Sequence, residues 1–156
     1  MNFFASLPYL VLIPLAVGFG TQLVKGLIET HGRLTLQAVD SYGGMPSTHT
    51  AITISLVTVI GLDQGLRSPV FSIAIITAII VIRDAIGFRR YLGSHGQALN
   101  LMVKELPAAE QGHFRRFQER LGHTPLEAFI GAIVGFCCSA VLYLALLPWI
   151  EPVRWY

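Results

Sequence analysis

The chain has 156 residues, of which 53% are hydrophobic and only 13% are charged, and its formal net charge at pH 7 is +2. Soluble domains carry about 25% charged residues, so the composition excludes an ordinary soluble protein and predicts one membrane-embedded domain over residues 1–156. The small net charge, without a basic run interleaved with aromatic residues, also excludes a nucleic-acid-binding surface.

Four apolar stretches are long enough to be membrane spans, since a transmembrane helix needs roughly 20 apolar residues. They cover residues 7–28, 50–66, 69–87 and 126–148, and the second is the weakest because Asp63 and Gln64 interrupt its end. The first stretch lacks the basic region of a signal peptide, so we expect it to be a span. The sequence therefore predicts an all-α polytopic helical bundle with about four transmembrane helices.

Polar segments connect these spans. A loop covers residues 29–49, a tight turn surrounds GLRSPV (65–70), and a longer polar segment runs from residue 89 to 123. The last contains LPAAEQGHFRRFQERLG (106–122), which predicts an interfacial helix with Phe114, Phe117 and Leu121 on one side.

The basic residues are unevenly distributed over the two faces that these spans define. An excess of Lys and Arg marks the cytoplasmic face, so we expect the segments 29–49 and 89–123 to face the cytoplasm of a bacterial-type inner or plasma membrane. An anion-binding site would be basic on either face. Of the eleven Lys and Arg residues only Arg67 and Arg154 fall on the other face; those on the loop face are Lys25, Arg33, Arg83, Arg89, Arg90, Lys104, Arg115, Arg116 and Arg120.

The stretch GGMPSTHTA (43–51) lies where the second span begins. Ser47 or Thr48 is a natural N-cap, and the free N–H groups of a first helical turn form an anion site. Capping alone would explain the glycines, the proline and the hydroxyls. It does not explain His49, since an ionisable side chain at a membrane boundary needs a partner or a task.

The fourth span opens with LGHTPLEAFIG (121–131), in which Thr124 and Glu127 form a capping box. Capping does not require His123. A histidine with a carboxylate four residues on can be held in one tautomer and made nucleophilic. Two histidines at two helix starts on one membrane face could therefore act as nucleophile and acid around a bound phosphate.

Phosphoryl transfer also needs cations beside the transferred group. Lys25, Arg89 and Arg90 are candidates, although Lys25 could equally pair with Glu29, and arginines that flank a span often only mark its edge. Asp84 lies within an apolar run and is expected to pair with one of these cations. We expect no metal and no cofactor, because the chain has no H-E-x-x-H motif, no cysteine pair at ligand spacing and no carboxylate cluster.

Three motifs in this order, GGMPSTHTA, RDAIGFRRYLG with Leu99-Asn100, and LGHTPLEAFIG, resemble the divergent branch of the type 2 phosphatidic acid phosphatase (PAP2) family, relatives of vanadium-dependent haloperoxidases. The similarity runs from about residue 25 to 135. It implies His49 as general acid, Ser47 with Thr48 as phosphate-binding residues, His123 as nucleophile, Glu127 as its orienting carboxylate, and Lys25 as the lysine of the first motif.

The chain also departs from the family pattern. Thr48 stands in place of a glycine and Glu127 in place of an aspartate, and Arg116 precedes His123 by seven residues where the family has six. The usual six-residue spacing occurs between Arg89 and His95, but no carboxylate lies four residues after His95. We therefore expect His123 as nucleophile with Arg89 and Arg90 as phosphate ligands, and His95 remains its competitor.

The resemblance implies an integral membrane phosphatase that hydrolyses a lipid phosphomonoester, such as phosphatidylglycerophosphate or phosphatidate, through a phosphohistidine intermediate and without metal. The family builds its site from six helices, so a helical 100–122 segment or a homodimer would complete it. The alternative is a non-catalytic membrane protein that binds anionic lipid headgroups or a partner through a retained phosphate pocket.

Overall fold

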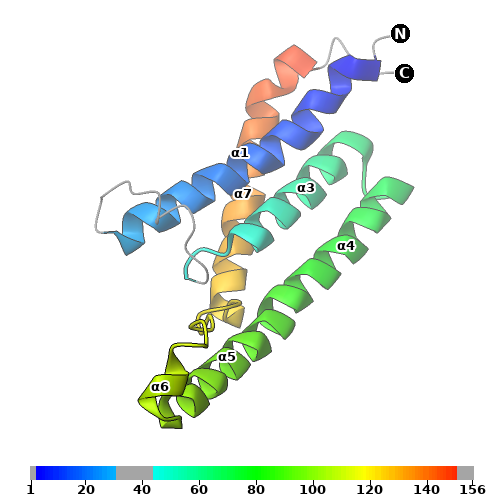
Figure 1. Cartoon of the computed structure of the whole chain (residues 1–156). Helices are drawn as coiled ribbons and strands as arrows, with labels where there is room; N and C mark the ends of the chain where they lie inside the picture. The colour runs from blue at the N-terminus through cyan, green and yellow to red at the C-terminus, as the bar shows by residue number, and fades with distance from the viewer. Residues whose placement is uncertain (1–2, 31–43, 151–156) are drawn as a thin grey trace.

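The computed structural model describes residues 3–30 and 44–150, and all regular structure in these ranges is helical (Figure 1). This confirms the all-α prediction. Most of the predicted 29–49 loop and Arg154 lie outside the described residues. The helices are α1 (Phe3–Glu29), α3 (Thr48–Gln64), α4 (Pro69–Ile86), α5 (Phe88–Glu105), α6 (Ala108–Gln111) and α7 (Pro125–Ile150).

Three helical stretches among the described residues are long and apolar enough to cross a membrane: Tyr9–Ile28, Pro69–Glu105 and Pro125–Pro148. The predicted span at 50–66 corresponds to α3, which has 17 residues and is shorter than the roughly 20 that a span needs. The predicted number of four spans is therefore approximate. α3 instead packs against α1, α4 and α7 and lies at the centre of the bundle.

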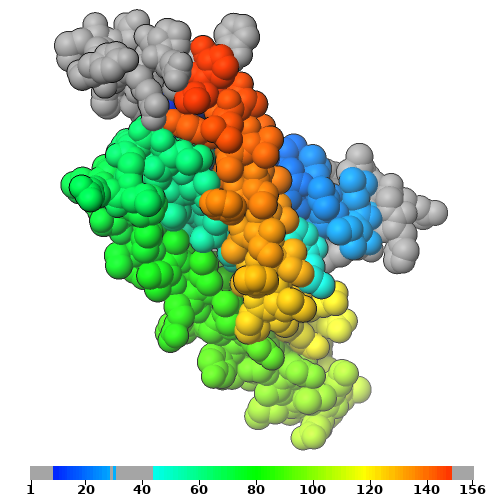
Figure 2. All heavy atoms as spheres, turned by 180° about the vertical axis from the view of Figure 1, so that it is seen from behind, coloured from blue at the N-terminus to red at the C-terminus, as the bar shows by residue number. Residues whose placement is uncertain are grey.

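The helix predicted over 106–122 is wrong in its position. Helix α5 ends at Glu105, α6 has only four residues, and residues 112–122 are not helical. The amphipathic helix lies upstream, at Phe88–Glu105, where it continues α4 past the end of the bundle (Figures 1 and 2). The segment after α6 leaves the helical path because the backbone of Phe117 forms hydrogen bonds with the Asn100 side chain.

Helices α3 and α7 approach each other closely because α7 carries glycines at positions 131 and 135. A Cβ atom on Gly131 would lie 2.5 Å from the Ser47 carbonyl oxygen, and one on Gly135 would collide with the Ala51 carbonyl oxygen. Glycines four residues apart let helix backbones meet in this way in membrane proteins. The contact brings the start of α3 beside the first turns of α7.

Two tyrosines and an aspartate join three helices at the opposite end of the bundle. The Tyr9 hydroxyl of α1 donates a 2.7 Å hydrogen bond to Asp63 Oδ1 of α3, and the Tyr143 hydroxyl of α7 donates a 3.3 Å bond to the same oxygen. Both tyrosines are buried next to Ile13 and Val59 in the apolar core. Asp63 is thus more than the ordinary helix terminus that its place in the sequence suggests.

The bundle has two distinct ends. The last turn of α1, the starts of α3 and α7, and the junction of α4 and α5 lie at one end, whereas the start of α1, the end of α7 and the α3–α4 turn lie at the other (Figure 1). The polar motifs singled out in the sequence therefore share one end, as the span assignment predicted.

We predict that Gly131→Ala destabilises the protein, because the new methyl group would meet backbone atoms of Ser47 that cannot move independently of α3. Such overpacking costs about 1–3 kcal/mol. The measurement is the thermal unfolding midpoint of the detergent-solubilised protein. Gly20→Ala is the matched control, since a Cβ there meets nothing within 4 Å and alanine favours a helix over glycine by about 0.5–1 kcal/mol. Equal midpoints for the two variants would contradict the account of the contact.

Candidate functional site

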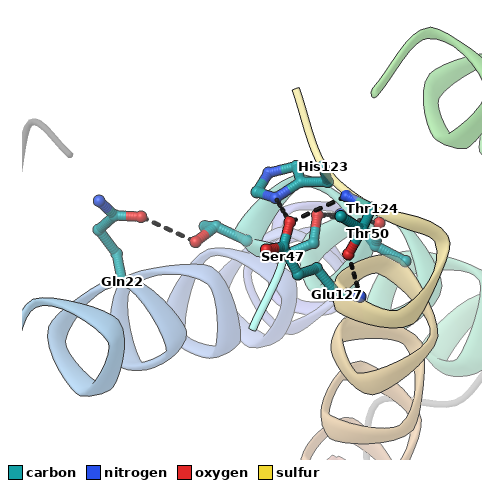
Figure 3. A network of polar contacts seen from close by, with 7 residues as sticks. Gln22, Ser47, Thr50, His123, Thr124 and Glu127 are labelled. Atoms are coloured by element: carbon teal, nitrogen blue, oxygen red, sulfur yellow. Dashed lines mark hydrogen bonds and ion pairs between the residues drawn. The ribbon is translucent and has the colours of Figure 1, made fainter. Parts of the chain in front are cut away.

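Ser47 caps the start of α3. It is one of the two residues, Ser47 and Thr48, that the sequence offered as the N-cap. The Ser47 hydroxyl oxygen accepts hydrogen bonds from the Thr50 N–H at 3.4 Å and from the Thr50 hydroxyl at 3.1 Å. The Ser47 N–H donates to the Glu127 carbonyl oxygen at 3.2 Å, which ties this helix start to α7. The Thr48 hydroxyl points instead to α1 and donates to Gln22 Oε1 at 2.8 Å (Figure 3).

The start of α7 has the predicted capping box. The Thr124 N–H donates to Glu127 Oε2 at 2.9 Å, and the Glu127 N–H donates to Thr124 Oγ1 at 3.2 Å. The same Glu127 Oε2 lies 3.3 Å from Nδ1 of His123 (Figure 3). One carboxylate therefore caps the helix and faces the histidine, which is the tautomer-fixing geometry expected of this pair.

His123 is held by backbone contacts with the α4–α5 junction as well as by α7. The backbone N–H of His123 donates a 2.9 Å hydrogen bond to the Ala85 carbonyl oxygen. The preceding Gly122 has φ of 81°, and a Cβ there would lie 2.6 Å from the Arg90 backbone nitrogen. Only glycine suits both the left-handed conformation and the close approach. The His123 side chain is consequently buried, with 6% of its surface exposed.

The two histidines singled out in the sequence are neighbours. The ring centroids of His49 and His123 are 6.2 Å apart, with an angle of 57° between the ring planes. His49 stands at the start of α3 and is exposed, whereas His123 is buried. The contact between α3 and α7 thus brings together residues that are 74 positions apart in the chain.

Cationic groups surround this pair. Lys25 of α1 is 2% exposed, and its charge lowers the pKa of both histidines. Arg89 lowers the pKa of His49 and forms a 2.9 Å ion pair with Asp84, so Asp84 pairs with a cation as predicted. The alternative pairing of Lys25 with Glu29 stays open, since the Glu29 side chain is not described.

Loss of contact with water is the main cause that lowers the pKa of each histidine below its ordinary value: His123 is buried, and His49, although its surface is exposed, is partly enclosed by protein. For His49 the charges of Arg89, His123 and Lys25 add to this effect and Asp84 opposes it. For His123 the Glu127 hydrogen bond and charge oppose burial, as does a hydrogen bond to the Gly44 backbone. Both rings are therefore biased toward the neutral form, and a bound anion would favour protonation again.

Some predicted residues lie apart from the pair. Arg90 and His95 are exposed on α5, and neither takes part in a polar side-chain contact of His123 or Glu127 within the described residues. No group of three or more His, Cys, Asp and Glu side chains in the described part of the chain could hold a metal ion.

The sequence did not indicate three groups that contact the site: the Gln22 side chain, Thr50 and the Ala85 carbonyl. Of these, only Thr50, three residues after the cap, had a local signal.

Comparison with known proteins agrees with the motifs. Residues 8–138 match the family model described as the divergent PAP2 family. The chain is 34% identical over 145 residues to the uncharacterized membrane protein YuiD of Bacillus subtilis (strain 168), covering 85% of this chain and 92% of that protein. No solved structure matches the chain significantly. Because the family model covers most of its length, the chain belongs to the divergent PAP2 family of membrane proteins.

Proposed function

We propose that this protein is a lipid-phosphate phosphatase that hydrolyses a phosphomonoester, such as phosphatidylglycerophosphate or phosphatidate, without a metal. The observation that carries the proposal is the pairing of His49 with His123 at 6.2 Å, with Glu127 behind His123 and two cations nearby. Membership in the divergent PAP2 family supports it. The excess of Lys and Arg at this end favours the cytoplasmic face, and hence inner-leaflet substrates.

In the first step the free ring nitrogen of neutral His123 attacks phosphorus while the bond from phosphorus to the lipid oxygen breaks. The leaving oxygen takes a proton from protonated His49, so the lipid alcohol departs neutral. Glu127 holds the Nδ1 proton of His123 and stabilises the positive charge that develops on the ring. Lys25 and Arg89 are the cations that would neutralise the equatorial phosphoryl oxygens.

In the second step water attacks the phosphohistidine and the bond from nitrogen to phosphorus breaks. Neutral His49 accepts the proton of that water, and inorganic phosphate leaves. Both histidines return to their starting protonation states, so each cycle consumes one water and one phosphomonoester.

We predict that the detergent-purified protein releases phosphate from at least one lipid of a phosphomonoester panel, insensitive to EDTA and inhibited by vanadate. His123→Ala should abolish release, and His49→Ala should lower it by about 10²–10⁴-fold, the usual contribution of a general acid. His95→Ala discriminates between the two candidate nucleophiles. Release that survives His123→Ala and is lost in His95→Ala would overturn the assignment.

The alternative function, a non-catalytic binder of anionic headgroups or of a partner, has one observation in its favour. The Ser47 side chain is fully buried in its cap, and the Thr48 hydroxyl is bonded to Gln22, so neither hydroxyl is presented freely to a ligand. Silence across the panel, together with headgroup binding that is unchanged in His123→Ala, would support this function over the phosphatase.

We predict an acidic pH optimum, because the reaction needs His49 protonated, and partial desolvation together with the nearby cations lowers its pKa below the ordinary value of about 6.5. The alkaline limb of kcat/KM should therefore have an apparent pKa below 6.5. Asp84→Asn removes the charge that raises the pKa of His49, so it should move this limb to lower pH. Glu110→Gln, an exposed change on α6, is the control. An optimum above pH 7, or a limb that does not move in Asp84→Asn, would contradict the proposed acid.

A further inference from the structure

The segment that precedes His123 is fixed to α5 by one side chain. Asn100 Nδ2 donates hydrogen bonds to the Phe117 carbonyl oxygen and to Glu119 Oε1, both at 2.8 Å, and Asn100 Oδ1 accepts one from the Phe117 N–H at 2.9 Å. Asn100 is buried, with 9% of its surface exposed. Its amide thus binds both backbone groups of Phe117, a pattern that needs a donor and an acceptor on the same side chain.

Two glycines on the same face of α5 let this segment lie against the helix. A Cβ on Gly93 would lie 2.7 Å from the Glu119 carbonyl oxygen, and one on Gly96 would collide with the Gln118 carbonyl oxygen. Gly93, Gly96 and Asn100 are the buried residues of α5. We call residues 113–122 the strap; it runs from α6 back to the start of α7 (Figure 1, yellow).

The strap ends at the candidate nucleophile. Beyond Glu119, Gly122 packs on the Arg90 backbone and the His123 N–H is bonded to the Ala85 carbonyl oxygen. His123 is therefore attached to α7 by Glu127 and to the α4–α5 helix by the strap. If the strap loosened from α5, the position of the His123 ring would depend only on Glu127 and on the last residues of the strap.

We propose that Asn100 is a positioning residue for the phosphatase reaction, which sets the place of His123 by holding the strap on α5. This inference rests on the proposed function. Asn100 does not touch the reacting groups; it acts through Phe117 and Glu119. A misplacement of about 1 Å at a reacting group can cost about 10²-fold in rate, so loss of the three hydrogen bonds should lower kcat more than it changes KM.

Three arginines in the strap make it possible to measure by proteolysis whether the strap stays bound to α5. Arg115, Arg116 and Arg120 are exposed, and none forms an ion pair with another described residue. Trypsin cleaves after arginine in segments that open locally, and the cleavage rate follows the population of the open form. Limited trypsin digestion of the detergent-solubilised full chain therefore reports on the strap without any dependence on activity.

The experiment compares the parent with Asn100→Ala, Asn100→Asp and the control Gln97→Ala, an exposed amide elsewhere on α5. Asn100→Asp keeps the acceptor for the Phe117 N–H, loses both donors and keeps the side-chain size, so it remains informative if Asn100→Ala does not fold. We expect faster cleavage in the strap and a fall in kcat of about 10- to 100-fold with little change in KM. The pKa of His123, measured by NMR, should rise toward its ordinary value as burial is lost. Gln97→Ala should match the parent.

Two results would overturn the inference. Unchanged cleavage in both Asn100 variants would show that the amide does not hold the strap. Faster cleavage with unchanged kcat and an unchanged His123 titration would show that the strap does not position His123. If the parent itself releases no phosphate, the proposed function fails separately, and the His123 titration alone then decides whether Asn100 controls the placement of that ring.

Discussion

The close contact of α7 with α3 at Gly131 places the starts of these two helices side by side, and the pairing of the two histidines depends on it. No side chain separates Gly131 from the Ser47 backbone, so the first turn of α3 rests beside the first turn of α7 and the Ser47 N–H reaches the Glu127 carbonyl. His49 and His123 follow from this contact, because each stands within a few residues of one of these two starts. A larger residue at 131 would separate the histidines before it affected either of them directly.

The Glu127 carboxylate has two roles in this arrangement: it caps α7 and it contacts the His123 ring. Its Oε2 atom accepts the Thr124 N–H and faces His123 Nδ1, so the charge that completes a helix cap also raises the pKa of the histidine against burial. A capping box is a common and purely local device. Here a histidine placed one residue before the cap shares its carboxylate, and under the proposed function this contact prepares His123 as the nucleophile.

The local features of the site and the grouping of the polar motifs at one end of the bundle were predictable from the sequence, whereas the individual contacts between distant side chains were not. Ser47 as a cap and the Thr124–Glu127 box follow from local chemistry, and both are present. The sequence of the strap has a helix-like pattern, but the strap is not helical in the structure. The Phe117 N–H forms its hydrogen bond with the side chain of Asn100, 17 positions earlier in the chain. Asp63 likewise finds Tyr9 and Tyr143 across 54 and 80 positions. The burial of the 17-residue helix α3 in the centre of the bundle also depends on distant residues, because α1, α4 and α7 pack around it.

Detection of a covalent phosphohistidine would test directly whether His123 is the nucleophile. The protein would be mixed with its preferred lipid phosphate, quenched within one turnover at alkaline pH, where a bond from nitrogen to phosphorus survives, and examined by peptide mass spectrometry. We expect one phosphoryl group on His123 in the parent protein and none in His123→Ala. Turnover without any phosphoryl adduct, or an adduct on His95, would contradict this assignment.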